Sequence, residues 1–265
     1  MDHGLEDQAS HSADTAPKVA VVQSPFDDYV RKYGTIQRRG VFGYFVHDLG
    51  RRIVGGEFQP GANLPNEPEL VEQFGISRTV VREAMKCLAG KGLVEIKTKI
   101  GTRVKEPKLW HHLDPDVMVW HYETGPSVEI MKSIKDLRRV LEPEATARAA
   151  VRATAEDIER ISAAYEAMVC TLGDVNANSD ADLRFHSAIF AATQNPIYAQ
   201  LIDLIGVAIY ANRAISSQEV VAEGQRASIP WHKSVLDAII ARDPDAALQA
   251  SHRLIDSWRI NRYDF

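Results

Sequence analysis

The chain has 265 residues, of which 45% are hydrophobic and 25% are charged, and these values are ordinary for a soluble globular protein. The length predicts about two domains. The two cysteines, Cys87 and Cys170, exclude a secreted scaffold stapled by disulfides. No apolar stretch is long enough to span a membrane, and we expect no signal peptide. These features predict a cytoplasmic protein whose cysteines stay reduced.

Charge is distributed unevenly along the chain, although the net charge is only −5. Residues 75–105 contain eight Lys and Arg residues and two acidic residues, so this window carries +6 and the rest of the chain −11. A basic segment in an acidic chain predicts one surface that binds a polyanion, joined to a module with a different task.

The first half of the chain predicts a small helical domain behind a polar arm. Residues 1–34 are polar and lack periodicity, so we expect a flexible arm. From Val41 an apolar residue recurs every four positions, which predicts a helix that ends at Gly55. The remaining elements expected here are helices over 67–74 and from 78 to about 89, and strands over 94–97 and 102–104.

This order of elements is that of a winged helix-turn-helix, whose second motif helix enters the major groove of DNA. Gly75 supplies the tight turn, and Ser77 is the expected N-cap of the reading helix. Arg78 and Arg82 lie one turn apart on one side of that helix. Arginine binds a guanine edge or a phosphate, and Thr79 can reach a phosphate or a thymine methyl. An amphipathic helix with solvated arginines is the alternative, and the basic wing favours DNA binding.

Four motifs make this region specific: Leu64-Pro-Asn-Glu-Pro-Glu-Leu70, Phe74-Gly-Ile-Ser-Arg-Thr-Val-Val-Arg-Glu-Ala84, Gly92-Leu-Val94 and Gly101-Thr-Arg-Val104. Together they resemble the winged-helix domain of GntR-family transcription regulators, and they imply a DNA-binding domain over 35–106. Pro68 replaces an arginine that many FadR-type members use on DNA, and Lys99 replaces a wing glycine. We expect DNA contacts from these residues: Ser77, Arg78, Thr79, Arg82 and Gly101, and also Lys99, which could contact a phosphate in place of the wing glycine.

After a linker over 107–126, the chain predicts an antiparallel all-helical bundle over 127–265. The expected helix starts carry a capping box or a proline in the first turn: Ser127, Thr154 with Asp157, Ser179 with Asp182, Asn195-Pro196 and Asp243-Pro244. The predicted fold class is therefore mainly α. It combines an N-terminal winged helix-turn-helix, with three helices and a two-stranded wing, and a C-terminal helical bundle.

Three histidines, His186, His232 and His252, lie on the apolar faces of three predicted helices. Asp182 precedes His186 by one turn and shares its face. One carboxylate and three imidazoles that converge in a bundle core would suit Zn, Ni, Mn or Fe. The alternative is that Asp182 completes a capping box with Ser179 and that each histidine is an ordinary core or surface residue.

The same positions carry a second resemblance. The segments Arg138-x-x-x-Glu142-Pro-Glu, Asp182-x-x-x-His186, His232-x-x-x-Leu236 and Ala246-Ala247…His252 resemble the FCD ligand-binding domain of FadR-type GntR regulators. The resemblance implies one divalent ion per chain, with zinc expected on purification, and a carboxylic-acid effector. It implies these metal ligands: Asp182, His186, His232 and His252.

The charge of such a site agrees with an anionic effector. A divalent ion with one aspartate and neutral histidines leaves the site at +1, which favours a small carboxylate. Arg138 is the first candidate to bind that carboxylate, because arginine pairs with it bidentately, and Arg213 is the second. The alternative for Arg138 is a surface ion pair with Glu142, four residues further along the helix.

The linker motif Trp110-x-x-Leu-Asp114-x-Asp116-Val-x-x-Trp120 resembles that of sugar-acid regulators of this family. The simpler interpretation, compatible with the first, is that its aromatic residues pack between the two domains. We expect a homodimeric, ligand-responsive transcription regulator, a repressor of a catabolic operon that binds a palindromic operator.

Two other classes of protein fit the sequence less well. A metal-dependent hydrolase is disfavoured because the sequence lacks the H-E-x-x-H motif of zinc hydrolases and the Glu-x-x-His pairs of di-iron bundles. We therefore expect that the protein is not an enzyme. An effector-independent DNA-binding protein is disfavoured by the long helical half.

Overall fold

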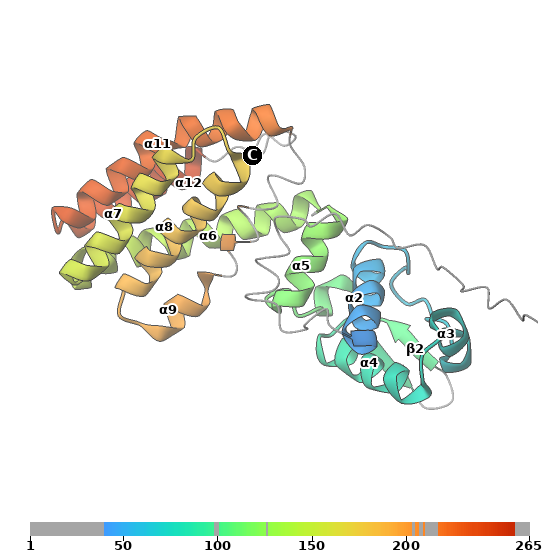
Figure 1. Cartoon of the computed structure of the whole chain (residues 1–265). Coiled ribbons are helices and arrows are strands. Elements are labelled where there is room, and N and C mark those ends of the chain that lie inside the picture. Colours follow the sequence, from blue (N-terminus) through green and yellow to red (C-terminus); the bar gives the residue numbers. More distant parts are fainter. Residues whose placement is uncertain are drawn as a thin grey trace, which may run out of the picture.

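The computed structural model describes residues 40–97, 101–125, 127–202, 205–206, 209 and 217–257. These residues form two lobes, which helix α5 (Pro115–Thr124) connects (Figure 1). The expected N-terminal arm over 1–34 lies outside the described residues. In the part of the chain that is described, no helix is long and apolar enough to cross a membrane.

The N-terminal lobe contains α2 (Gly40–Val54), α3 (Glu67–Phe74) and α4 (Arg78–Gly90), as the sequence predicted. The turn between α3 and α4 follows from local chemistry. Asn66 and Glu69 form a capping box at the start of α3, and Gly75 ends the helix in the left-handed conformation with φ of 63°. Ser77 then accepts the backbone N–H of Val80 and begins α4.

A small sheet completes this lobe. Strands β1 (Val94–Lys97) and β2 (Gly101–Val104) pair antiparallel, with Val94 opposite Val104. Those two valines are buried at the base of the hairpin, while the rest of both strands is largely exposed. The lobe's core is made by apolar residues of α2 and α4: Phe45, Leu49, Ile53, Val81 and Leu88.

The segment expected to be a linker is more regular than the sequence suggested. A short 3-10 turn, η1 (Pro107–Leu109), leads to α5, where Asp114 caps the helix and Pro115 occupies its first turn. The six consecutive residues 116–121 are all buried. A helix buried on every side lacks the amphipathic period that marks a surface helix, so periodicity alone could not identify it.

The C-terminal lobe is a helical bundle. Long helix α6 (Val128–Arg152) packs against α12 (Pro244–Ser257), α7 (Ala155–Cys170) packs against α8 (Val175–Ala192), and α11 (Gln218–Ile240) packs against α12. The short helix α9 (Pro196–Gln200) follows α8. The core is lined by residues from five helices: Ala149, Ile161, Phe185, Ile239 and Leu254.

The helix starts expected at Ser127, Thr154 and Asn195 are confirmed, and α12 begins at Pro244 as predicted. The start expected at Ser179 is wrong. Helix α8 is capped five residues earlier, where Asp174 accepts two backbone N–H groups, and the Ser179 hydroxyl donates to the carbonyl of Val175 inside the helix. Asp182 is therefore a mid-helix residue whose carboxylate is not used for capping.

Candidate functional site

Three candidate metal ligands meet inside the bundle. Asp182 and His186 lie one turn apart on α8, and His232 reaches them from α11. Asp182 Oδ1 lies 3.3 Å from His186 Nε2 and 3.1 Å from His232 Nε2. The three ligand atoms all lie within 4.8 Å of one another, and no other such group was found among the described residues. Their spacing allows all three to share one ion.

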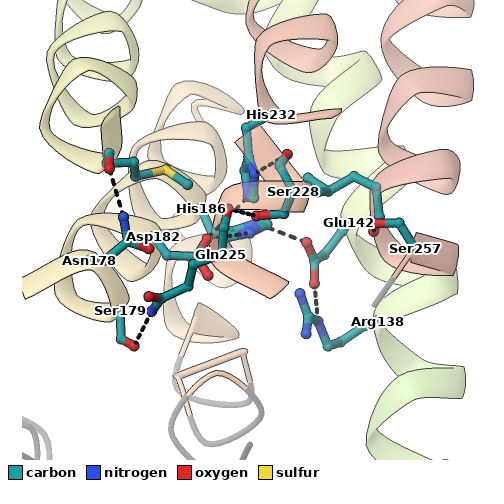
Figure 2. Close-up of polar contacts among 12 residues, drawn as sticks. Arg138, Glu142, Asn178, Ser179, Asp182, His186, Gln225, Ser228, His232 and Ser257 are labelled. Carbon is teal, nitrogen blue, oxygen red and sulfur yellow. Dashed lines mark hydrogen bonds and ion pairs between the residues drawn. The ribbon is translucent and has the colours of Figure 1, made fainter. Parts of the chain in front are cut away.

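The second nitrogen of each imidazole has a partner of its own (Figure 2). His186 Nδ1 donates to Glu142 Oε2 at 2.9 Å, and His232 Nδ1 donates to the carbonyl of Ser228 at 3.0 Å. These bonds place a proton on Nδ1 of both rings and direct both Nε2 atoms toward Asp182. The ring of Phe185 meets both imidazoles edge-on, with centroids 5.8 and 5.2 Å away, and restricts their rotation.

Glu142 extends this network to an arginine. Arg138 Nε donates to Glu142 Oε1, one turn along α6, and both side chains are buried. Burial alone would raise the pKa of Glu142, but Arg138 and His186 lower it to about 2. The ion pair that was considered as a surface alternative for Arg138 therefore exists, but inside the bundle.

The neighbours of the carboxyl groups in the cluster favour the deprotonated, negatively charged form of those groups. Burial would raise the pKa of Asp182, but hydrogen bonds from His186 and His232 hold it well below its usual range. Burial would likewise lower the pKa of His186, but the carboxylates of Glu142 and Asp182 raise it to about 9. In the metal-free protein a proton on His186 therefore balances part of the negative charge that a cation would otherwise balance.

The donor set fits a divalent transition metal. Two imidazole nitrogens and one carboxylate oxygen are ligands that Zn, Ni, Mn and Fe accept. The hydrogen bonds from the far side of each ring to a carboxylate and a backbone carbonyl are the arrangement that usually supports a metal-binding histidine.

The fourth expected ligand, His252, is not part of this group. It lies on α12 and is partly exposed, whereas the buried face of that helix is formed by its neighbours: Ala247, Ala250, Ser251, Leu254 and Ile255. The sequence pattern placed His252 on the apolar face because it counted Leu248, which is only half-buried, as part of that face. The second expected effector residue, Arg213, lies outside the described residues.

A polar group with an unused acceptor lies next to the cluster. Gln225 of α11 donates through Nε2 to the Ser179 hydroxyl and to the carbonyl of Val175, both at 3.1 Å. Its Oε1 is buried and has no hydrogen-bond partner within the described chain. Figure 2 shows this side chain between Ser179 and the Asp182–His186 pair. An orphaned buried acceptor is costly, so a ligand that donates a hydrogen bond would be stabilised there.

The expected DNA-reading residues lie together at the start of α4. Arg78, Thr79 and Arg82 are all exposed, and Ser77 caps the helix that carries them. Arg82 Nε donates to both carboxylate oxygens of Glu67, at 3.0 and 2.9 Å, so this arginine has an intramolecular partner on α3. Arg78 and Thr79 thus extend from the helix that, in this motif, enters the major groove.

The wing is described only in part. Gly101 begins β2 with φ of 108°, a conformation that favours glycine. Lys99, which was expected at the DNA backbone, lies outside the described residues. Arg103 of β2 donates to the backbone carbonyl of Gly61, and this bond ties the wing to the loop before α3.

Comparison with known families agrees with this architecture. Residues 45–104 match the model of bacterial regulatory proteins of the gntR family, and residues 133–257 match the FCD domain. The galactonate operon transcriptional repressor of Escherichia coli is 36% identical over 221 residues, which cover 80% of this chain and 92% of that protein. The chain belongs to the GntR family. This GntR protein is therefore a DNA-binding transcription regulator with a ligand-binding FCD domain.

A second relative supports the same assignment, and one solved structure shares the fold. The transcriptional repressor NanR of Cronobacter sakazakii is 30% identical over 217 residues, which cover 79% of this chain and 80% of that protein. The structure of Listeria monocytogenes Lar, described as controlling expression of the agr system, covers 83% of this chain and 97% of its own, with a TM-score of 0.54 and 19% identity. At that identity the likeness shows the fold alone. Both of these relatives are named as transcriptional repressors.

Sequence reasoning missed three contributors to the FCD site. Glu142 was considered only as a partner of Arg138, and neither the Ser228 carbonyl nor Gln225 was considered. The spacing of Arg138 and Glu142 predicts their ion pair, but no local pattern predicts that Glu142 also contacts His186 on another helix. A backbone carbonyl carries no sequence signal at all.

Proposed function

We propose that this GntR protein is a metal-dependent repressor that binds its operator as a homodimer and responds to a small hydroxylated carboxylate. The observation that carries the proposal is the convergence of Asp182, His186 and His232 in the FCD domain of a DNA-binding regulator. Hydrogen bonds at Nδ1 orient both imidazole rings toward this site. A regulator of DNA acts where the DNA is, so we place it in the cytoplasm.

Asp182 Oδ1 and the Nε2 atoms of His186 and His232 would hold the ion. When bound, a divalent cation supplies positive charge and open coordination positions for a chelating ligand. Glu142 keeps the proton of His186 on Nδ1, and the Ser228 carbonyl does the same for His232. We propose three protein ligands rather than four, because His252 is not among the grouped atoms.

The charge of the occupied site favours an anion. Arg138 offsets Glu142, and Asp182 offsets half the charge of a divalent ion, so the site retains one positive charge. A small carboxylate would neutralise it. The unpartnered Oε1 of Gln225 adds a need for a hydrogen-bond donor, which a hydroxyl group supplies. An acid that carries hydroxyl groups meets both requirements, and relatives are named for the galactonate operon and as NanR.

At the DNA, Arg78 and Thr79 would read base edges and phosphates from the N-terminal turn of α4. One such helix covers only a few base pairs, so we propose that two copies bind a palindromic operator, with half-sites set by the dimer.

The metal is tested first. Purified protein should contain one divalent ion per chain by mass spectrometry of metals. Glu142→Gln should weaken metal affinity by about 10–100-fold, because the orienting carboxylate is lost. Glu144→Gln is the matched control, since Glu144 lies on the same helix and forms an exposed ion pair with Arg148. Equal metal affinity in the two variants would remove Glu142 from the site.

The effector is tested next with D-galactonate and with a short carboxylate that lacks hydroxyl groups. Galactonate should release the protein from operator DNA in the metal-loaded form and fail to do so after chelation. Gln225→Leu should reduce the preference for galactonate over the unhydroxylated acid. An unchanged response in metal-free protein would contradict a sensing role for the ion.

A further inference from the structure

A buried lysine lies at the junction between the reading helix and the connecting helix. Lys91 directly follows α4 and is only 7% exposed. Its Nζ donates to Asp114 Oδ1 at 2.8 Å and to Asp116 Oδ2 at 2.6 Å. Asp114 is the N-cap of α5, and Asp116 lies in its first turn. One ammonium group therefore joins the C-terminal end of the reading helix to the N-terminal end of α5.

Backbone contacts strengthen this junction. The carbonyl of Lys91 accepts the backbone N–H of His111 at 3.0 Å. Gly92 has φ of 79°, and a Cβ at this position would lie only 2.7 Å from the carbonyl oxygen of Leu109. The segment that precedes α5 thus passes so close to the end of α4 that only glycine fits there.

The rest of α5 also fits closely against the DNA-binding lobe. The Trp120 ring covers Gly50 of α2 so tightly that a Cβ there would lie 2.5 Å from the ring. Trp120 Nε1 donates to His47 Nδ1 at 3.0 Å, and His47 Nε2 lies 3.1 Å from Glu123 Oε2. These contacts are directional, so they fix the orientation of α5 on α2.

The contact of α5 with the C-terminal lobe of α6–α12 (the sensor lobe) has a different chemistry. Met118 packs in a small apolar cluster with Met131 and Ile134 of α6. Apolar contacts are not directional, and methionine adapts readily to changed surroundings. Gly125, with φ of 81°, ends α5 just before α6. Val117 and Trp120 of α5 also belong to a buried apolar cluster that includes residues of α8. These contacts with the sensor lobe are apolar, whereas those with the DNA-binding lobe include directional hydrogen bonds.

We propose that Lys91 is a positioning residue that makes α5 move as one body with the DNA-binding lobe, so that ligand state in the bundle reaches the reading helix through α5. Transmission of the ligand state through α5 rests on the proposed function. The joint movement of α5 and the DNA-binding lobe does not rest on it. A buried ion pair contributes little net stability compared with apolar residues, but it specifies geometry. Fixed geometry between α4 and α5 is what such a coupling requires.

The experiment compares Lys91→Met/Asp116→Asn and Asp116→Asn with wild type, all as full-length protein. The double variant avoids leaving the buried carboxylate of Asp116 without its cation, while the part-exposed Asp114 remains in contact with solvent. The single variant is available if the double one does not fold. Arg139→Met is the control, because it removes an exposed ion pair with Asp256 between α6 and α12. Hydrogen exchange measures amide protection, and operator binding is measured with and without D-galactonate.

We expect amides of α5 to exchange at least tenfold faster in the junction variants, with exchange in α11 and α12 unchanged. The ratio of operator affinities without and with galactonate should fall to less than a third of the wild-type ratio. Unchanged protection of α5, or an equal loss across the bundle, would overturn the inference. If wild type ignores galactonate, the proposed effector is wrong, while the exchange result still decides whether Lys91 fixes α5.

Discussion

In the DNA-binding lobe the side chains proposed to contact DNA are exposed, whereas in the sensor lobe the two histidines proposed to hold the ion are buried and contacted on both sides. Arg78 and Thr79 project from a helix whose position is set by the core beneath it. His186 and His232 instead have a partner at each ring nitrogen. DNA supplies the missing partners of exposed arginines, but an ion of fixed geometry needs ligands that are oriented before it arrives.

The difference predicts how each lobe responds to substitution. Loss of one exposed side chain that contacts DNA should remove only its own share of the operator affinity and leave the other contacts intact. Loss of one buried ligand should remove the whole function of its site, because the remaining atoms no longer form a ligand set.

The largest expected effect is loss of the metal. His232→Ala removes one of three grouped ligands and should abolish stoichiometric metal binding, while operator binding without effector is retained. His252→Ala is the matched control and should keep one ion per chain. Metal content is measured by mass spectrometry after dialysis. Loss of the ion in His252→Ala would restore that residue to the ligand set and contradict the three-ligand site.

The next effect concerns base reading. Arg78→Ala should weaken binding to the specific operator by about 1–3 kcal/mol, the value of a good bidentate base contact. Binding to unrelated DNA should change less, because base recognition contributes little there. Fluorescence anisotropy with both DNAs measures the difference. Equal losses on the two DNAs would show that Arg78 contacts phosphate rather than a base.

The connecting helix predicts an acid-sensitive contribution to stability. Burial lowers the pKa of His121 to about 4, and His112 acts in the same direction. Between that value and the ordinary histidine pKa of about 6.5, the unfolded chain binds the proton and the folded chain does not. The contribution of His121 is therefore present at pH 7 and is lost as the pH falls from about 6.5 toward 4.

His121→Gln tests this window. From pH 7 to pH 5 the free energy of unfolding should fall by about 2 kcal/mol more in wild type than in the variant, given about 1.4 kcal/mol per pKa unit. Urea unfolding at the two pH values measures it, and contributions from carboxylates common to both proteins cancel. Parallel pH profiles would show that His121 is not buried in its neutral form.

The smallest effect is expected at the ion pair that occupies Arg82. Glu67→Gln frees this arginine and removes a negative charge near the DNA, so operator affinity should rise by less than about 1 kcal/mol, as for other exposed pairs. Glu83→Gln is the control, because Glu83 forms an exposed ion pair with Lys86 on α4 itself. A loss of affinity in Glu67→Gln would show that the pair positions Arg82 for DNA instead of competing with it.

Local sequence signals predicted much of the fold. Caps at Ser77, Ser127 and Thr154 marked helix starts within a residue, because each cap bonds a backbone N–H only three positions further along the chain. Periodicity failed at α5, which is buried on every side, and the capping rule failed at Ser179, whose hydroxyl bonds within α8. Both failures arise where tertiary packing overrides a local preference.

The sequence by itself determined the two kinds of lobe, the reading helix with its exposed arginines, and the pairing of Asp182 with His186 on one helix face. These features depend on spacings of three to seven residues, which helix geometry converts directly into position. Only the tertiary structure decided that His232 joins the pair, that His252 does not, and that Glu142 and Lys91 link separate helices. Those outcomes depend on the rotation and register of helices that are distant in sequence, and core packing fixes both.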